Sequence, residues 1–172
     1  MFIEMKKQRL DFTFGTAKLW LRYDIGAFYN IEESGYSPFD IISQSNDPKA
    51  VRCFLENGLA DWYESIDDTN GIDEYVNRLM SAEDYQTELL TLMQSAVLLA
   101  LPQGRIGNKR EKPDSSGNIL NLMTAFVDVM GASKEEFIHS TMREASERWE
   151  RYAVAMGYIK PAEKFRRYDD DD

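Results

Sequence analysis

Residues 10–24 read LDFTFGTAKLWLRYD, and this stretch decides how the chain begins to fold. Apolar side chains occupy every second position on both sides of Gly15-Thr16, namely Leu10, Phe12 and Phe14 before it and Leu19, Leu21 and Tyr23 after it. Alternation with a period of two on either side of a glycine turn predicts a β-hairpin. Because an isolated hairpin is only marginally stable in water, its apolar face must pack on the segments that follow.

Capping residues and apolar stripes predict a series of short helices after the hairpin. Asp24 is positioned to cap a helix that ends at Gly35. Ser37-Pro38 and Asp47-Pro48 each place a capping residue directly before a proline, which is the order favoured in a first helical turn. The helix that starts at Asp47-Pro48 is expected to end at Gly58.

Two longer helices are predicted in the second half of the chain. Ser81 and Asp84 have the spacing of a capping box for the first of them. The far end of that helix, residues 96–101, is apolar on all sides, which indicates either complete burial or an interface. Ser133 and Glu136 have the same spacing and predict the start of the last helix.

Composition divides the chain into four parts. Residues 102–118 mix glycine and proline with charged side chains, which predicts a flexible linker or a long loop. This segment separates an N-terminal module, residues 1–101, from a C-terminal helical hairpin, residues 119–160. Residues 161–172 end in four aspartates and predict a disordered acidic tail. The expected fold class is therefore mainly α, with an N-terminal β-hairpin, several short helices and two longer C-terminal helices.

The charge balance argues against several classes of partner. Thirty acidic residues face twenty basic ones, which gives a formal net charge of −10. Such a chain repels phosphate backbones and anionic membrane surfaces, so neither nucleic acid nor membrane is expected as a partner. The longest apolar run, residues 96–101, is far shorter than the roughly 20 residues that span a bilayer. Cys53 is the only cysteine, which fits a reducing cytoplasmic compartment.

The sequence contains no recognisable catalytic or metal-binding pattern. Glu136 and His139 match one half of a di-iron helix motif, but no second histidine exists to complete the site. Residues 67–71 resemble a calcium loop only in part, because Ile66 and Asn77 would stand where acidic ligands are required. We therefore expect no enzyme activity, no metal and no cofactor, and we expect the chain to act by binding other proteins.

Residues 8–62 resemble the start of the tail assembly chaperones of long-tailed bacteriophages. In that family a short strand segment leads into an aromatic-Asp, Ala, Ile-Glu-Glu and Gly pattern, and then into a helix that ends near Gly-Leu. The matching residues here are Tyr23-Asp24, Ala27, Tyr29-Asn30-Ile31-Glu32-Glu33, Gly35, Ser37 and Phe54-Leu55-Glu56-Asn57-Gly58-Leu59.

The resemblance implies a protein of virion assembly that works in the host cytoplasm and is absent from the mature virion. It would bind the tape-measure protein, keep that long helical protein soluble and recruit tail-tube subunits. Two alternatives stay open. The first is a structural virion protein such as a head–tail connector or tail-completion subunit, and the second is an acidic DNA-mimic inhibitor.

An apolar stripe ending at Gly131 predicts a further helix over residues 119–130. A helical partner could be bound in the helix-in-groove mode, by this stripe and by the apolar end of the helix over residues 82–101. Methionine suits such surfaces because its side chain repacks on varied partners. The hypothesised partner-binding residues are Ala96, Val97, Leu98, Leu101, Leu122, Met123, Phe126 and Met130. Since a large exposed apolar patch is unusual on a free monomer, we expect the chain either to self-associate through this surface or to close over it.

Overall fold

The structure, a computed structural model, describes residues 8–66, 71–102 and 123–158. It is mainly helical with one N-terminal hairpin, as the sequence predicts. The strands are β1 (Leu10–Phe14) and β2 (Ala17–Leu21), and the helices are α1 (Ile25–Glu33), α2 (Pro48–Glu64), α3 (Ile72–Met80), α4 (Gln86–Ala100), α6 (Lys134–Ile138) and α7 (Met142–Ala155). Three further short helices are η1 (Ile42–Gln44), η2 (Glu83–Tyr85) and η3 (Ala125–Val129).

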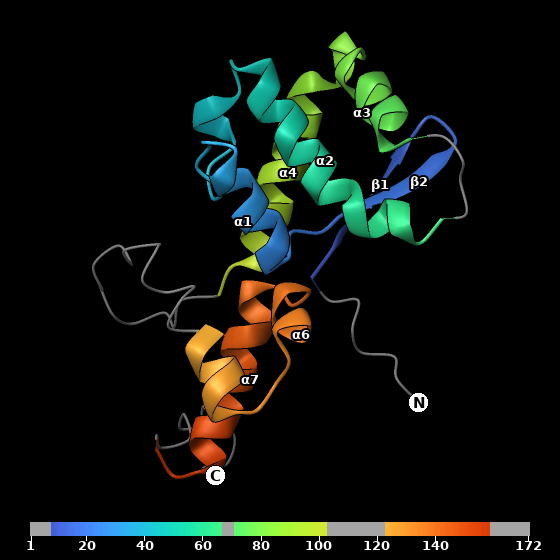
Figure 1. The fold of residues 1–172 in the computed structure, drawn as a ribbon. Helices are drawn as coiled ribbons and strands as arrows, with labels where there is room; N and C mark the ends of the chain where they lie inside the picture. Colours follow the sequence, from blue (N-terminus) through green and yellow to red (C-terminus); the bar gives the residue numbers. More distant parts are fainter. Residues whose placement is uncertain (1–7, 67–70, 103–122, 159–172) are drawn as a thin grey trace, which may run out of the picture.

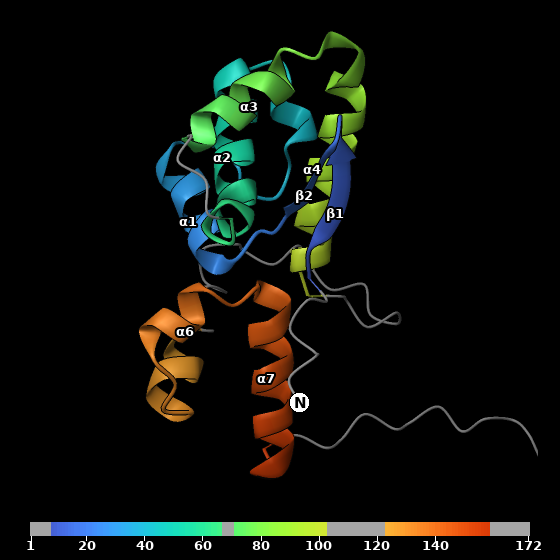
Figure 2. The same ribbon diagram turned by 90° about the vertical axis from the view of Figure 1, so that its right-hand side faces the viewer.

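The described elements form two groups in space (Figure 1). The hairpin and helices α1 to α4 make one group, in which α2 contacts α1, α3, α4 and β2. Elements η3, α6 and α7 make the second group, which lies at one end of the first, and a view from the side agrees (Figure 2). We call residues 8–102 the N-terminal module and residues 123–158 the C-terminal module. The predicted linker 102–118, apart from Pro102, and the predicted tail 161–172 lie outside the described residues.

The hairpin forms where the alternating pattern predicts it. The strands are antiparallel, with Leu10 opposite Leu21 and Phe12 opposite Leu19. Gly15 has a φ of +59°, a left-handed conformation that suits glycine in the tight turn. The apolar face of the hairpin lies against α2 and α4, while the second face carries Asp11, Thr13, Lys18 and the half-buried Trp20.

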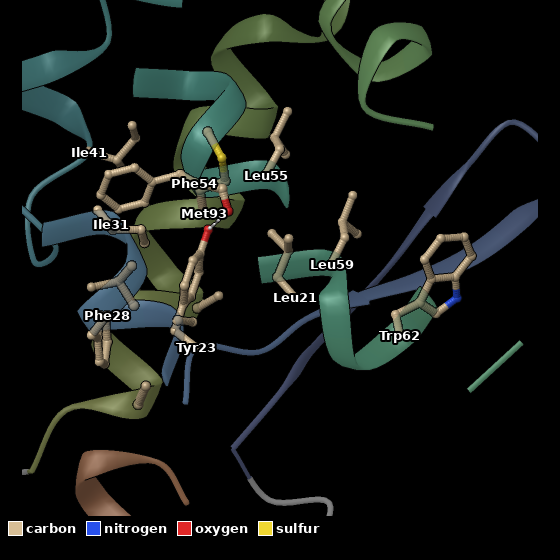
Figure 3. Close-up of a cluster of buried hydrophobic side chains, with 14 of the residues drawn as sticks. Leu21, Tyr23, Phe28, Ile31, Ile41, Phe54, Leu55, Leu59, Trp62 and Met93 are labelled. Carbon is tan, nitrogen blue, oxygen red and sulfur yellow. Dashed lines mark hydrogen bonds between the residues drawn. The ribbon is translucent and has the colours of Figure 1, made fainter. Parts of the chain in front are cut away.

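The core of the N-terminal module is built around Tyr23, which immediately follows β2. Tyr23 is fully buried, and its ring lies close to the rings of Phe28 and Phe54 (Figure 3). Its hydroxyl donates a hydrogen bond of 3.0 Å to the carbonyl oxygen of Phe54. Burial raises the pKa of the Tyr23 phenol, which therefore stays neutral and keeps its proton for this bond.

Three predicted helix boundaries are confirmed. The Asp24 side chain accepts a hydrogen bond of 2.7 Å from the backbone N–H of Ala27 and so caps α1. Gly35 follows the end of α1 with a φ of +86°. Asp47 caps α2, and Pro48 occupies the first helical position.

Other predicted boundaries are wrong. Gly58 does not end α2, which continues to Glu64. Ser81 does not start α4 but is the C-cap residue of α3, where its backbone N–H donates a hydrogen bond to the carbonyl of Asn77. Helix α4 begins only after η2. Ser37-Pro38 begins a turn in place of a helix, since the backbone around Ser37 bonds to the Gln44 side chain.

The last helix is divided in two. Ser133 caps α6 as predicted, but α6 ends at Ile138. The chain then turns, and the carbonyl of Ser140 accepts a hydrogen bond of 2.9 Å from the backbone N–H of Ile25 in the N-terminal module. Thr141 and Glu144 form a complete capping box that starts α7. Of the helix predicted over residues 119–130, the described part contains η3, and residues 119–122 lie outside it.

Candidate interaction surfaces

The predicted partner-binding residues do not form one exposed stripe. Ala96 and Val97 are buried in the core of the N-terminal module, and Phe126 is buried in the C-terminal module. Leu98 is 56% exposed. Three of the predicted residues are half-buried and pack against the core, namely Leu101, Met123 and Met130. Leu122 lies outside the described residues.

The packing of the chain on itself explains this distribution. The hairpin and α2 lie against α4, so Ala96 and Val97 are covered by the chain's own side chains. In the C-terminal module the ring of Phe126 lies 5.5 Å from that of Phe137, and the guanidinium of Arg148 lies 4.9 Å from the Phe126 ring centre. Of the seven predicted residues that the structure describes, Leu98 is the one whose side chain is most open to solvent.

A different apolar surface lies at the free end of the C-terminal module. Tyr158 is 60% exposed, Met156 53% and Val129 46%. The hydroxyl of Tyr152 donates a hydrogen bond of 3.3 Å to the carbonyl of Val129 and so ties η3 to α7. The Tyr152 ring also lies 5.8 Å from the Trp149 ring and 6.3 Å from the Tyr158 ring. We call Val129, Trp149, Tyr152, Met156 and Tyr158 the distal patch.

An apolar groove lies where α2 and α4 begin and α3 ends. These helix ends lie at the end of the molecule away from the C-terminal module (Figure 1). The volume of the groove is about 120 Å³. Apolar side chains line most of it, namely Pro48, Val51, Met80, Leu89 and Leu90. We call it the α2–α4 groove. Its walls come from segments that are far apart in the sequence.

A polar cluster joins the two modules. Arg22, at the end of β2, donates a hydrogen bond of 2.7 Å to the carbonyl of His139 and lies 3.3 Å from the carboxylate of Glu144. Its other terminal nitrogen lies 3.7 Å from Asp24 and 3.8 Å from Asp61. Arg22 therefore attaches α6 and α7 to the N-terminal module.

Asp24 occupies the protected side of this cluster. Loss of hydration on burial raises the pKa of its carboxyl, although the backbone N–H of Ala27 and the Arg22 and His139 side chains act in the opposite direction. Within residues 8–66, 71–102 and 123–158, no group of three or more His, Cys, Asp or Glu side chains is arranged to hold a metal ion. Among the helices in those ranges, none has the length and apolarity needed to cross a membrane.

Sequence reasoning missed both the distal patch and the groove. Trp149, Tyr152 and Met156 recur at helical spacing, which is the same signal that buried residues give. The groove had no sequence signal, because it forms only when the ends of three helices meet. Comparisons of the chain with protein-family models, with curated proteins and with solved structures found no match.

Proposed function

We propose that this chain is a bacteriophage tail assembly chaperone. In this role it binds the tape-measure protein in the host cytoplasm, keeps it soluble and recruits tail-tube subunits. The observation that carries the proposal is the distal patch, which presents aromatic and methionine side chains to solvent on a chain with a formal net charge of −10.

The composition of the distal patch favours protein binding. Tyrosine, tryptophan and methionine are enriched in protein interfaces. The two aromatic side chains bury a large area at a low cost in conformational entropy, and the flexible methionine side chain adapts to the surface it contacts. Met156 and Tyr158 are more than half exposed, although burial of such a side chain stabilises a protein by about 1.5–3 kcal/mol. A partner with an unpaired apolar stripe would bury that stripe against these side chains, and the complex would gain the stabilisation.

The resemblance to the chaperone family adds support of a different kind. Its residues occupy the structural positions that their chemistry predicts: Asp24 caps α1, Ile31 is fully buried and Gly35 follows the helix end. These residues determine local folding, so they support a family fold for the N-terminal module. The functional part of the proposal rests on the exposed surface.

Co-expression with the tape-measure protein of the same phage tests the proposal. The parent chain should raise the soluble fraction of that protein, and Tyr158→Asp should remove the effect while the variant stays folded. Tyr29→Asp is a matched control, because Tyr29 is 56% exposed on α1 and the substitution makes the same change in charge. An equal soluble fraction with and without the parent chain would refute the proposal.

The alternative of a structural virion protein makes a different prediction about the finished particle. A connector or tail-completion subunit would keep the distal patch buried permanently against its neighbours. Mass spectrometry of purified virions separates the two functions, since a chaperone should be missing and a structural subunit present in stoichiometric copies.

A further inference from the structure

We propose that two copies of this chain pair through their β1 strands, which run antiparallel and join the two hairpins into one continuous sheet. The contact uses the outer edge of β1, a surface separate from the distal patch, and it does not depend on the proposed function. Two observations carry it, namely the direction of the backbone groups in the hairpin and the symmetric side-chain pattern of β1.

The outer edge of β2 is already covered by α2. The carbonyl of Lys18 accepts a hydrogen bond of 3.2 Å from the indole N–H of Trp62, and the backbone N–H of Arg22 donates one of 2.9 Å to the carbonyl of Gly58. Every second residue of an antiparallel strand directs its backbone groups to the same edge. The backbones of Lys18, Trp20 and Arg22 therefore face α2, and the residues between them bond to β1. Figure 2 shows β2 between α2 and β1.

The outer edge of β1 is open. Asp11 lies opposite Trp20 and Thr13 opposite Lys18, so the N–H and C=O groups of Asp11 and Thr13 point away from β2. Within the described ranges, the structure gives none of these backbone groups a hydrogen-bond partner. Another extended strand presents donors and acceptors at the matching two-residue spacing, so the chemistry of the edge selects a strand as its occupant.

The edge of β1 lacks the features that usually protect such a strand from pairing. Lysine, proline and β-bulges are common protections. The sequence of β1 is LDFTF, without lysine or proline, and its register with β2 is continuous from Leu10 to Phe14. Leu10, Phe12 and Phe14 are only half-buried against the core, and a paired strand would cover them further.

The pattern of β1 makes the strand complementary to itself. Apolar and polar residues alternate in the same order in both directions from Phe12. With a two-fold axis at Phe12, Asp11 of each copy lies opposite Thr13 of the other, and each such pair exchanges both backbone hydrogen bonds. On the apolar face Leu10 then meets Phe14. An axis at Asp11 would place two carboxylates directly opposite each other, which is destabilising.

The charge of the hairpin permits this contact. The whole chain has a formal net charge of −10, which opposes self-association. In the hairpin, residues 9–21, the charged residues are Arg9, Asp11 and Lys18, so two bases face one acid. Pairing through β1 thus brings together a part of the chain that carries no net negative charge.

Sedimentation equilibrium of the full chain and amide exchange by NMR test the proposal together. The average mass should rise with concentration from that of one chain towards that of two. Over the same range, exchange of the Asp11 and Thr13 amides should slow, because they become bonded to the second copy. The Phe12 and Phe14 amides already bond to β2 and should change little. This alternation is specific to strand pairing.

Charge substitutions at Thr13 separate association from folding. Residue 13 faces Lys18 in its own hairpin and Asp11 of the second copy in the pair. Thr13→Asp should therefore raise the urea midpoint measured at low protein concentration, yet raise the Kd of association about fivefold. Thr13→Lys should lower both. A role in folding alone would instead make the more stable variant associate at least as tightly as the parent.

Removal of one backbone donor tests the edge directly. Thr13→Pro deletes the outward N–H but no hydrogen bond to β2, and should raise the Kd of association at least about tenfold. Thr13→Val is the matched control, since it keeps the N–H and a branched side chain, and its Kd should stay within about twofold of the parent. If Thr13→Pro does not fold, the two charge variants decide the question.

Three results would overturn the proposal. The first is the mass of a single chain at every concentration. The second is an association that Thr13→Pro leaves intact and Tyr158→Asp abolishes, which would assign self-association to the distal patch. The third is slowed exchange at Asp11 and Thr13 only after the tape-measure protein is added, which would assign the edge to a strand of that partner.

Discussion

The ring of Tyr23 lies directly against the backbone of Gly58. A Cβ atom at residue 58 would come within 2.8 Å of the Cζ and Oη atoms of Tyr23, so only glycine fits in this part of α2. The Tyr23 hydroxyl also bonds to the carbonyl of Phe54, and the backbone N–H of Arg22 donates a hydrogen bond of 2.9 Å to the carbonyl of Gly58. These contacts fix the end of the hairpin on the middle of α2.

Gly58→Ala should therefore destabilise the protein, although alanine is the better helix former. The added methyl group overpacks the core at a cost of about 1–3 kcal/mol, against a gain of about 1 kcal/mol from helix propensity. We expect a net loss of up to about 2 kcal/mol in the unfolding free energy measured by urea denaturation. In the double variant with Tyr23→Leu the cost of the alanine should largely disappear, and an unchanged cost would show that the ring is not its cause.

The same contact explains why the end of α2 could not be predicted from the sequence. Glycine after an apolar stripe is a typical helix stop, and this interpretation holds at Gly35, where φ is positive. At Gly58 the glycine is required by a residue 35 positions earlier in the chain, and the helix continues. Sequence spacing alone does not distinguish a glycine that ends a helix from one that admits a neighbouring ring.

Val97 and Leu98 are adjacent in α4 and should respond in opposite ways to the same substitution. Leu98 is 56% exposed, so the Leu98→Asp variant should have nearly the same midpoint of urea unfolding as the parent protein. Val97 is fully buried, so Val97→Asp should lose several kcal/mol through an unpaired buried carboxylate and should unfold or aggregate. Circular dichroism of both variants at one temperature checks the pair, and equal stability of the two would contradict the placement of α4.

The pair also marks the limit of sequence reasoning about the candidate surface. Residues 96–101 are apolar on every side, which predicts complete burial or an interface but does not say which side is covered. In the structure Ala96, Val97 and Ala100 are buried, whereas Leu98 is exposed. The neighbours of α4 come from distant parts of the chain, namely the hairpin, α2 and α7. The hairpin, the first caps and the helical class follow from local patterns, whereas the groove and the distal patch depend on contacts between distant segments.

Asp24 should make stability depend on pH in a direction opposite to that of most carboxylates. Folding raises its pKa above the ordinary value of 3.8, mainly because burial removes hydration, with Asp61 adding to the effect. The folded state thus holds this proton more tightly than the unfolded state. The resulting stabilisation is fully present below pH 3.8 and is lost as the pH rises through the folded-state pKa.

Asp24→Asn isolates this contribution, because asparagine caps a helix as well as aspartate does. The unfolding free energy of the variant, relative to that of the parent, should rise as the pH increases above 3.8 and then become constant. Urea denaturation over a series of pH values measures the difference. A relative stability that falls with rising pH would mean that Arg22 and His139 outweigh the loss of hydration.

Arg22 should hold the C-terminal module in place. Its side chain is 13% exposed and bonds to the carbonyl of His139 and to Glu144, so its loss removes hydrogen bonds that join the two modules. Arg22→Met keeps the aliphatic stem and removes hydrogen bonds of a charged group, each worth about 1.5–3 kcal/mol. Amide hydrogen exchange should become faster over residues 139–145, while the exchange of β1 and β2 stays near that of the parent.

Arg151→Met is the matched control for that experiment. Arg151 is 83% exposed and lies 3.9 Å from Glu147, so its removal should change exchange little. Glu144→Gln isolates the ion pair, because glutamine can still complete the capping box with Thr141 but cannot form an ion pair with Arg22. If the ion pair holds the module, Glu144→Gln should speed exchange over residues 139–145 to a lesser degree than Arg22→Met. If both variants retain the parent's protection, packing of apolar side chains such as Met142 and Ala145 attaches α7 without help from the charges.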